Sequence, residues 1–294
     1  MAKLGDLGLF FLCSTLLTVG VSSLSLPLSL AYTHIHITGE YARVQVADTN
    51  LIRTPLTNET LTPELERDYV LVSDVWPTSW QSIDRSGFQP GDNIAIWGAG
   101  PVGLLAAYTA RLRGAGRIYV VDHVQQRLDR AASIGAVPVN FVTQDVVETL
   151  LAAEPQGITR LVDCVGFEAL TANLTVDTNI VMRQMIAVSQ LDGGIGIGGV
   201  YIMPPQGPSN PRIAEVSREF VFDAQTYFTN RLVMQGGLLE ARAVGPTLVN
   251  LIATGVAHPS ALLSGSEISI DQVPEYYARF ERWEETKVFI NFPW

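Results

Sequence analysis

The stretch NIAIWGAGPVGLLAAYTARLRGAGRIYVVD, residues 93–122, decides the fold of this chain. It opens with an apolar run, turns through the glycine-rich residues 98–103, and continues in a helical pattern over residues 104–112. A second apolar run, residues 118–121, ends at Asp122. Strand, glycine turn, helix and strand within about 30 residues make one βαβ unit.

The glycine turn has the spacing Gly-x-Gly-x-x-Gly, directly after a strand and at the start of a helix. Gly98 permits a tight turn, Gly100 lets the backbone approach a pyrophosphate, and Gly103 permits close helix–strand packing. The helix N-terminus attracts phosphates, and Asp122 is placed to accept both hydroxyls of a ribose. We therefore predict a dinucleotide site. The alternative is a turn that binds nothing, with Asp122 as a helix cap.

The same alternation continues downstream. We expect helices at 125–134, 144–153 and 179–189, and strands at 137–141, 161–166 and 193–201, after the first strand at 93–97. This pattern predicts an α/β fold with a doubly wound parallel sheet and right-handed crossovers. Val165, Gly198 and Val200 then lie at the carboxyl ends of strands, where such sheets bind ligands. Cys164 is interpreted as a small core residue.

Composition limits the remaining possibilities. The 294 residues suit one large domain or two ordinary ones, and 47% hydrophobic against 16% charged residues excludes a disordered chain. With 29 acidic and 19 basic side chains, the net charge of −10 argues against general nucleic-acid binding. Cys13 and Cys164 are too few for a disulfide scaffold or a four-thiolate zinc site.

The N-terminal segment 1–39 differs from the rest of the chain. Residues 7–32 carry no charge and are rich in Leu, Phe, Val and Ser, which suits a signal peptide or a membrane anchor. Asp6 and Pro27 weaken both interpretations, and a buried strand or helix, or a replaced native segment, remains open. The remaining residues are typical of a cytoplasmic protein, so a membrane role depends on residues 7–32 alone.

Several stretches resemble the medium-chain alcohol dehydrogenase superfamily. They are Gly91-Asp92 leading into the 98–103 turn, and Val120-Val121-Asp122 followed by Arg127-Leu128. Two more, SDVWPTSW at 73–80 and VDCVGFEA at 162–169, resemble the glutathione-independent formaldehyde dehydrogenases within that superfamily. The resemblance covers about residues 40 to 294, but the match is poor over 204–235.

The resemblance implies a Rossmann-type domain inserted into a split catalytic domain, which is truncated here. We expect residues 40–87 to be a remnant of the catalytic domain, 88–263 the dinucleotide-binding domain and 264–294 the returning part. The implied cofactor is NAD, and family members form dimers or tetramers through the edge strand of this domain. The cofactor-binding residues are then Gly98, Gly100, Pro101, Val102, Gly103, Asp122, Arg127, Val165, Gly198 and Val200.

The resemblance also bears on zinc. Family members carry their Cys and His zinc ligands in a segment ahead of residue 41, and this sequence has no counterpart of it. Asp74 matches a third ligand, but one carboxylate cannot hold Zn²⁺, and the alternative is a helix N-cap. Gln81 stands where the family commonly has a His. His34 and His36 could share one strand face as metal ligands, or simply face solvent. We expect no catalytic zinc.

Two functions follow. The first is an NAD-dependent oxidoreductase acting on a small-molecule alcohol or aldehyde, without catalytic zinc. Its catalytic residues are unknown, since no motif places the available candidates, which are Thr78, Ser79, Tyr201 and His258. The second is a truncated, catalytically inactive relative that only binds dinucleotide.

Overall fold

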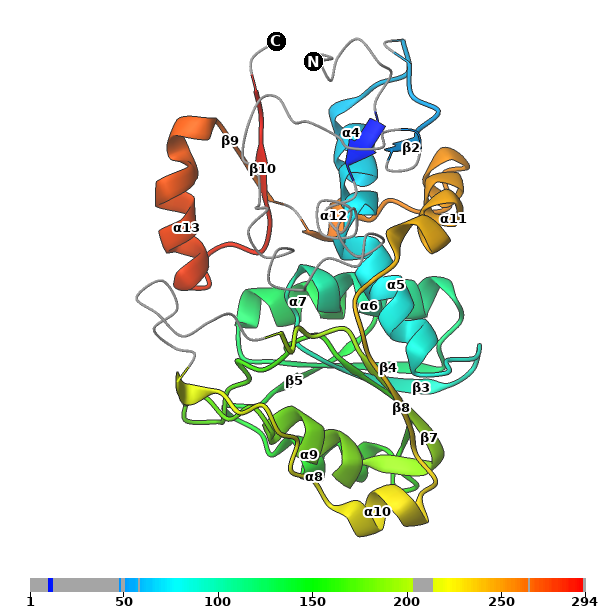
Figure 1. The fold of residues 1–294 in the computed structure, drawn as a ribbon, viewed down its shortest axis with the longest axis vertical. Helices are drawn as coiled ribbons and strands as arrows, with labels where there is room; N and C mark the ends of the chain where they lie inside the picture. Colours follow the sequence, from blue (N-terminus) through cyan, green and yellow to red (C-terminus); the bar gives the residue numbers. More distant parts are fainter. Residues whose placement is uncertain are drawn as a thin grey trace. The chain divides into compact units, whose positions relative to one another are not determined.

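The computed structural model describes residues 10–12, 48, 51–57, 59–202, 214–263 and 265–292. The chain forms two units, Ser79–Leu238 and Met1–Thr78 together with Leu239–Trp294 (Figure 1). These limits differ from the boundaries at residues 88 and 263 that the sequence predicted. The first limit lies earlier than residue 88 because Ser82 and Ser86 pack against the sheet of the Ser79–Leu238 unit.

The Ser79–Leu238 unit is built on a six-stranded, entirely parallel sheet of order β5-β4-β3-β6-β7-β8. Its strands are β3 Asn93–Trp97, β4 Arg117–Asp122, β5 Val137–Asn140, β6 Ile158–Asp163, β7 Ser189–Ile197 and β8 Val233–Gln235. The chain winds outward from β3 to β5 and then returns to place β6 on the other side of β3. The predicted α/β fold with a doubly wound sheet is confirmed, and its topological switch lies between β3 and β6.

Helices cover both faces of this sheet (Figure 1). Helices α6 Pro101–Leu112 and α7 Gln125–Ser133 pack on β3, β4 and β5, and α8 Val146–Ala153 and α9 Ile180–Ala187 cover the opposite face. Helix α8 starts two residues later than predicted, because the Asp145 side chain caps it by accepting from the Glu148 amide at 2.8 Å. The short helix α10 Ala224–Thr229 precedes β8.

Helix α5 (Val75–Arg85) explains the glycines of β7. A Cβ atom on Gly194 would lie 1.9 Å from the carbonyl oxygen of Ser86, and one on Gly196 would lie 2.0 Å from that of Ser82. Backbone therefore packs directly on backbone, which only glycine permits. The alternate residue Ile195 points to the other face and joins the core there.

Strand β7 ends at Ile197, so the predicted limits of 193–201 were wrong at both ends. The amides of Gly198 and Gly199 leave the ladder and both donate to the carbonyl oxygen of Asp163, at 2.8 and 2.9 Å. Val200 and Tyr201 consequently belong to the loop after the strand.

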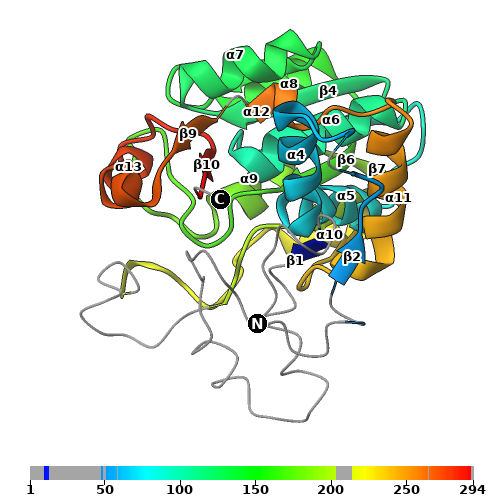
Figure 2. The same ribbon diagram turned by 90° about the horizontal axis from the view of Figure 1, so that it is seen from above.

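The other unit combines helices with two small sheets. Its elements are β1 Phe10–Leu12, β2 Leu51–Arg53, α4 Pro63–Val70, the 3₁₀ helix η2 Leu71–Ser73, α11 Ala241–Ala253, α12 Ser260–Leu263, β9 Ser266–Ile268, the 3₁₀ helix η4 Ile270–Gln272, α13 Val273–Glu281 and β10 Val288–Ile290. Strands β1 and β2 pair antiparallel, and β9 and β10 pair parallel. Helix α13 lies beside the β9–β10 pair in both views (Figures 1 and 2).

The apolar run 7–32 is described only at β1, and His34 and His36 lie outside the described residues. A search of the described part of the chain finds no helix long and apolar enough to cross a membrane.

Candidate functional site

The glycine turn after β3 is the centre of the candidate site. Gly98 has a φ of 92°, a conformation that favours glycine, and its amide donates to the carbonyl oxygen of Val121 at 2.7 Å. A Cβ atom on Gly103 would lie 1.8 Å from the carbonyl oxygen of Gly98. These two glycines are therefore required by the turn itself and by the approach of α6 to β3.

Gly100 has a different environment from the other two. A Cβ atom there would have no atom outside its immediate chain neighbours within 4 Å, so space lies open in front of it. Gly100 caps α6, and Pro101 and Val102 form the first residues of the helix. The amides of a first helical turn lack intrahelical acceptors and attract anions. The turn can therefore receive a phosphate or pyrophosphate at Gly100.

Asp122, at the end of β4, holds the turn in place. Its Oδ2 accepts the amide of Ala99 at 2.6 Å, and its Oδ1 accepts the amides of His123 at 2.7 Å and Val124 at 2.9 Å. The residue is buried, with 6% of its surface exposed. A carboxylate has about four acceptor positions, so one remains for a further donor such as a hydroxyl.

Two basic residues lie beside Asp122. Nδ1 of His123 is 3.6 Å from Oδ1 of Asp122, and the imidazole packs at 5.1 Å from the ring of Phe141. Burial lowers the pKa of His123, the Asp122 carboxylate opposes this shift, and Arg127 adds to it. Burial also lowers the pKa of Arg127, again opposed by Asp122. Arg127 therefore lies within the electrostatic reach of Asp122, at the start of α7.

The loops after β6 and β7 meet at the same edge of the sheet. The amide of Phe167 donates to the carbonyl oxygen of Val200 at 3.2 Å, and a Cβ atom on Gly166 would lie 2.6 Å from the backbone of Val200. Next to the glycine turn, a Cβ atom on Gly98 would contact Val165 at 3.1 Å. The structure thus brings Gly98, Val165 and Val200 to the carboxyl end of the sheet.

Asp163 was missed as a site residue in the sequence analysis. Its side chain is fully buried, with Oδ1 accepting the amides of Val165 at 2.7 Å and Gly166 at 3.2 Å, and Oδ2 accepting the hydroxyl of Tyr201 at 2.8 Å. Burial raises its pKa, and the three donors oppose the shift. An acidic residue closing the apolar run Leu161–Val162 was the available signal, since a buried carboxylate needs partners.

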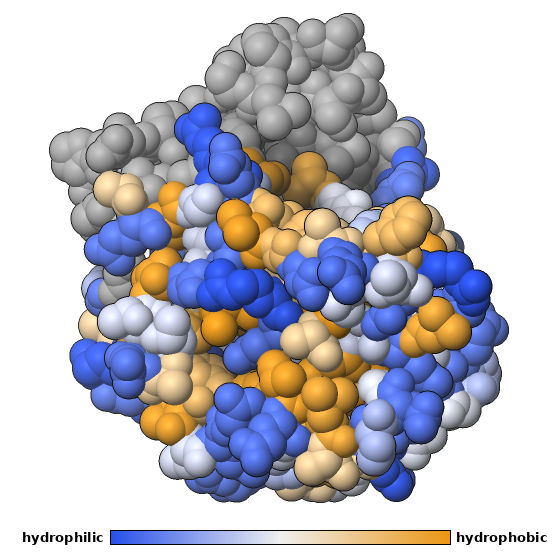
Figure 3. Space-filling view, turned by 90° about the horizontal axis from the view of Figure 1, so that it is seen from below, coloured by the Kyte–Doolittle hydropathy of each residue, from blue (hydrophilic) through white to orange (hydrophobic). Residues whose placement is uncertain are grey.

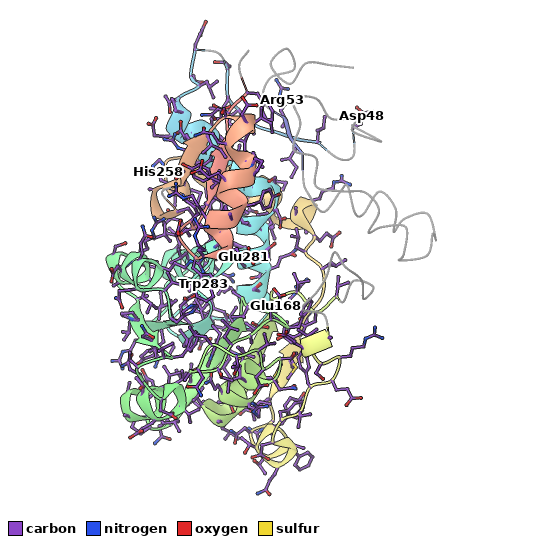
Figure 4. The ribbon with its side chains drawn as sticks, turned by 90° about the vertical axis from the view of Figure 1, so that its left-hand side faces the viewer. Asp48, Arg53, Glu168, His258, Glu281 and Trp283 are labelled. Atoms are coloured by element: carbon purple, nitrogen blue, oxygen red, sulfur yellow. The ribbon has the colours of Figure 1, made fainter. Side chains whose placement is uncertain are left out.

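The candidate catalytic residues named from the sequence all interact with other groups of the protein. The hydroxyl of Tyr201 donates to Asp163, and burial followed by the Asp163 charge raises the pKa of Tyr201 above its ordinary range. Ser79 donates to the carbonyl oxygen of Val102 at 2.7 Å. His258 lies 3.2 Å from the buried carboxylate of Asp68, near α12 (Figure 4).

Asp74 directly precedes α5, and its Oδ1 accepts the hydroxyl of Thr78 at 2.9 Å. The nearby Lys287 has a pKa that burial lowers and that the Asp74 charge raises. Among the described residues, no three His, Cys, Asp or Glu side chains gather where they could hold a metal ion. A catalytic zinc has three protein ligands, and Asp74 offers one carboxylate, which interacts with the ammonium group of Lys287.

Several known proteins are similar to this chain in sequence. The family described as zinc-binding dehydrogenase matches residues 101–187, which include the last three residues of the glycine turn and all of α6, α7 and β6. The glutathione-independent formaldehyde dehydrogenase of Bacillus subtilis (strain 168) is 31% identical over 262 residues, covering 86% of this chain and 62% of its own length. This chain belongs to the medium-chain dehydrogenase superfamily.

Solved structures of alcohol dehydrogenases and zinc-binding dehydrogenases have the same fold. The alcohol dehydrogenase TADH from Thermus sp. ATN1 superposes with a TM-score of 0.71 at 25% identity, over 86% of this chain and 66% of the other. A putative zinc-binding dehydrogenase from Sinorhizobium meliloti 1021, solved bound to NADP, gives 0.68 at 23% identity, over 87% and 67%. The chain thus spans less than two thirds of the formaldehyde dehydrogenase it matches.

Proposed function

We propose that the Ser79–Leu238 unit binds a nicotinamide dinucleotide, with NAD preferred over NADP. The observation that carries this proposal is the glycine turn, where open space in front of Gly100 adjoins the N-terminus of α6 and the carboxylate of Asp122. The pyrophosphate would lie at Gly100, Pro101 and Val102, and the adenosine ribose at Asp122 with Arg127 beside it. Val165, Gly198 and Val200 would then contact the nicotinamide half.

The charge at Asp122 supports the preference for NAD. A ribose 2′-hydroxyl can donate to this carboxylate, whereas a 2′-phosphate would bring a like charge into contact with it. Arg127 and His123 lie nearby, but burial lowers the pKa of both. Burial therefore disfavours the protonated form of His123, whereas the guanidinium of Arg127 stays charged and already interacts with the Asp122 carboxylate.

We propose that the reaction is the oxidation of a small alcohol or aldehyde, or its reverse. A bound nicotinamide would accept a hydride from the carbon of an alcohol or of a hydrated aldehyde, and the hydroxyl proton of that substrate would pass to solvent or a base. The formaldehyde and alcohol dehydrogenases among the similar proteins support this substrate class. Because the Asp74 environment does not fit zinc, we propose a chemistry in which this chain supplies no catalytic zinc of its own.

The alternative is a relative that binds dinucleotide and catalyses nothing. Gln81, where the superfamily commonly carries a His, favours it, because an amide cannot relay a proton. Calorimetric titration with NADH tests binding, and NADH formation from formaldehyde and simple alcohols, followed with metal content by elemental mass spectrometry, tests catalysis. Tight NADH binding without turnover would select the alternative. Turnover with one zinc per chain would contradict the zinc-free chemistry.

We also propose that two copies associate along β8, the edge strand of the parallel sheet. An edge strand presents unpaired backbone groups to a second chain. Val233 on β8 is 65% exposed, and Phe228 on α10 is 81% exposed. The face on the side of α10 carries a central gathering of hydrophobic residues (Figure 3). Light scattering of the wild type should give the mass of two chains, and Val233→Lys should reduce it to the mass of one. An unchanged mass in Val233→Lys would argue against association along β8.

A further inference from the structure

Asp163 connects the two loops that follow β6 and β7. Its side chain accepts the amides of Val165 and Gly166 in the first loop, and its carbonyl oxygen accepts those of Gly198 and Gly199 in the second. The hydroxyl of Tyr201, also in the second loop, reaches Oδ2 of the same residue at 2.8 Å. One fully buried residue therefore ties the two loops together.

The two loops approach each other so closely at Gly199 that a side chain there would clash with the first loop. A Cβ atom on Gly199 would lie 2.3 Å from the amide nitrogen of Gly166 and 2.7 Å from Oδ2 of Asp163. The ring of Tyr201 is itself held edge-on, at 4.8 Å from Phe220 and 6.5 Å from Phe167. Aromatic pairs of this geometry add to the apolar contact and fix the direction of the hydroxyl.

The loops carry apolar side chains at their outer ends. Val165 is 38% exposed and Val200 is 60% exposed. Exposed apolar side chains at the carboxyl edge of a doubly wound sheet are suited to contact with the flat ring of a ligand. The Val165 amide donates to Oδ1 of Asp163, and the Val200 carbonyl oxygen accepts the amide of Phe167.

We propose that Asp163 and Tyr201 are positioning residues for the nicotinamide half of the cofactor. Their hydrogen bond holds the loops that carry Val165 and Val200 together, so that the two side chains meet the nicotinamide ring without prior rearrangement. This inference rests on the proposed dinucleotide site. Without the bond, the loops would sample other positions, and binding would have to restore the order at a cost in affinity.

The two halves of the cofactor allow a direct test with the full chain. ADP-ribose contains the adenosine, the pyrophosphate and the second ribose but lacks the nicotinamide, so its affinity should not depend on the contacts that Val165 and Val200 make with the nicotinamide ring. In Tyr201→Phe, we expect the Kd for NADH to rise about tenfold, as the loss of one hydrogen bond to a buried carboxylate implies. The Kd for ADP-ribose should stay within about twofold of the wild type. Isothermal calorimetry measures both.

Two further variants complete the experiment. Tyr227→Phe is the matched control, because the Tyr227 ring packs at 5.5 Å from Phe222 in the same unit and takes no part in the Asp163 network. Its NADH affinity should equal that of the wild type. Asp163→Asn keeps an oxygen for the amides of Val165 and Gly166 but removes the charge that Tyr201 faces. Asp163→Asn should also weaken NADH binding while leaving ADP-ribose binding unchanged. It replaces Tyr201→Phe in the experiment if that variant folds poorly.

The outcomes separate this inference from the proposed function. Equal weakening of NADH and ADP-ribose, or no weakening of either, in both Tyr201→Phe and Asp163→Asn would overturn the positioning role and leave the dinucleotide site intact. A wild-type chain that binds neither ligand would overturn the proposed function and this inference with it. Selective loss of NADH supports both.

Discussion

The backbone amide of Ala99 donates a 2.6 Å hydrogen bond to Oδ2 of Asp122. The residue proposed to recognise the ribose therefore also anchors the turn proposed to bind the pyrophosphate. Because β3 and β4 are neighbours in the sheet, the end of β4 lies beside the turn that follows β3. Changes at Asp122 should consequently affect both cofactor choice and stability.

Replacing Asp122 by Asn should narrow the preference for NAD over NADP. In the wild type, a like-charge contact with the 2′-phosphate costs about 1–4 kcal/mol, or roughly one to three decades of affinity. Asn removes the charge but keeps one acceptor oxygen, so we expect a stability loss of about 1–2 kcal/mol from the unmet amides. Calorimetry with NAD and NADP, with chemical unfolding alongside, measures both effects.

Asp129→Asn is the control for this substitution, since Asp129 lies exposed on α7 and bonds only to Gln125 among the hydrogen bonds described for it. It should change neither cofactor preference nor stability. A wild-type chain that binds NADP as tightly as NAD would contradict the role of Asp122.

Gly100→Ala and Gly103→Ala should separate binding from folding. The Cβ atom at position 100 meets no atom within 4 Å, so we expect a change in unfolding free energy below about 1 kcal/mol. Dinucleotide affinity should nevertheless fall at least about tenfold, because the methyl group occupies the path of the pyrophosphate.

At position 103, the added Cβ atom would lie 1.8 Å from the carbonyl oxygen of Gly98, so the turn cannot form as it stands. We expect Gly103→Ala to lose about 3 kcal/mol or more of stability. Thermal unfolding and NADH titration of both variants check the contrast. Unchanged NADH affinity in a stable Gly100→Ala chain would exclude the pyrophosphate from this turn.

The pH dependence of stability should reveal the buried Asp163. Burial raises its pKa above the ordinary value of 3.8, so its carboxylate takes up a proton at a higher pH in the folded chain than in the unfolded chain. Its favourable contribution is then fully present below 3.8 and is lost as pH rises through the raised pKa. The difference in unfolding free energy between the wild type and Asp163→Asn should therefore fall as the pH rises from 3.8 through the raised pKa. Urea titrations from about pH 3.5 to neutrality measure it; a difference that grows with pH would contradict the shift.

Gly196→Ala should destabilise the chain through packing alone. Its Cβ atom would lie 2.0 Å from the carbonyl oxygen of Ser82, so α5 would have to move away from β7. We expect a loss of about 3 kcal/mol, measured by chemical unfolding, with little change in the NADH affinity of the folded fraction. Gly100→Ala serves as the control without a clash. A Gly196→Ala chain as stable as the wild type would show that α5 is not held against β7.

Much of the parallel sheet could be predicted from local patterns. Strand 93–97 was predicted with the limits that β3 has, and the positions of β4, β5, β6, α6 and α7 agree to within a few residues. Their apolar runs and helical periods are properties of adjacent residues, and the glycine turn and Asp145 cap mark the ends locally. Strand β8 was not predicted, because its three residues are too few to show a period.

The tertiary structure decided what the polar and glycine residues do. Sequence alone placed Gly98, Gly100 and Gly103 in a turn, but only the fold distinguishes the open space at Gly100 from the contacts that require the other two. Likewise, the partners Tyr201 and Asp163 are 38 residues apart, and they meet only because β6 and β7 are neighbours. Periodicity reports which face of an element is apolar, whereas the groups that lie opposite a side chain depend on strand order and helix packing.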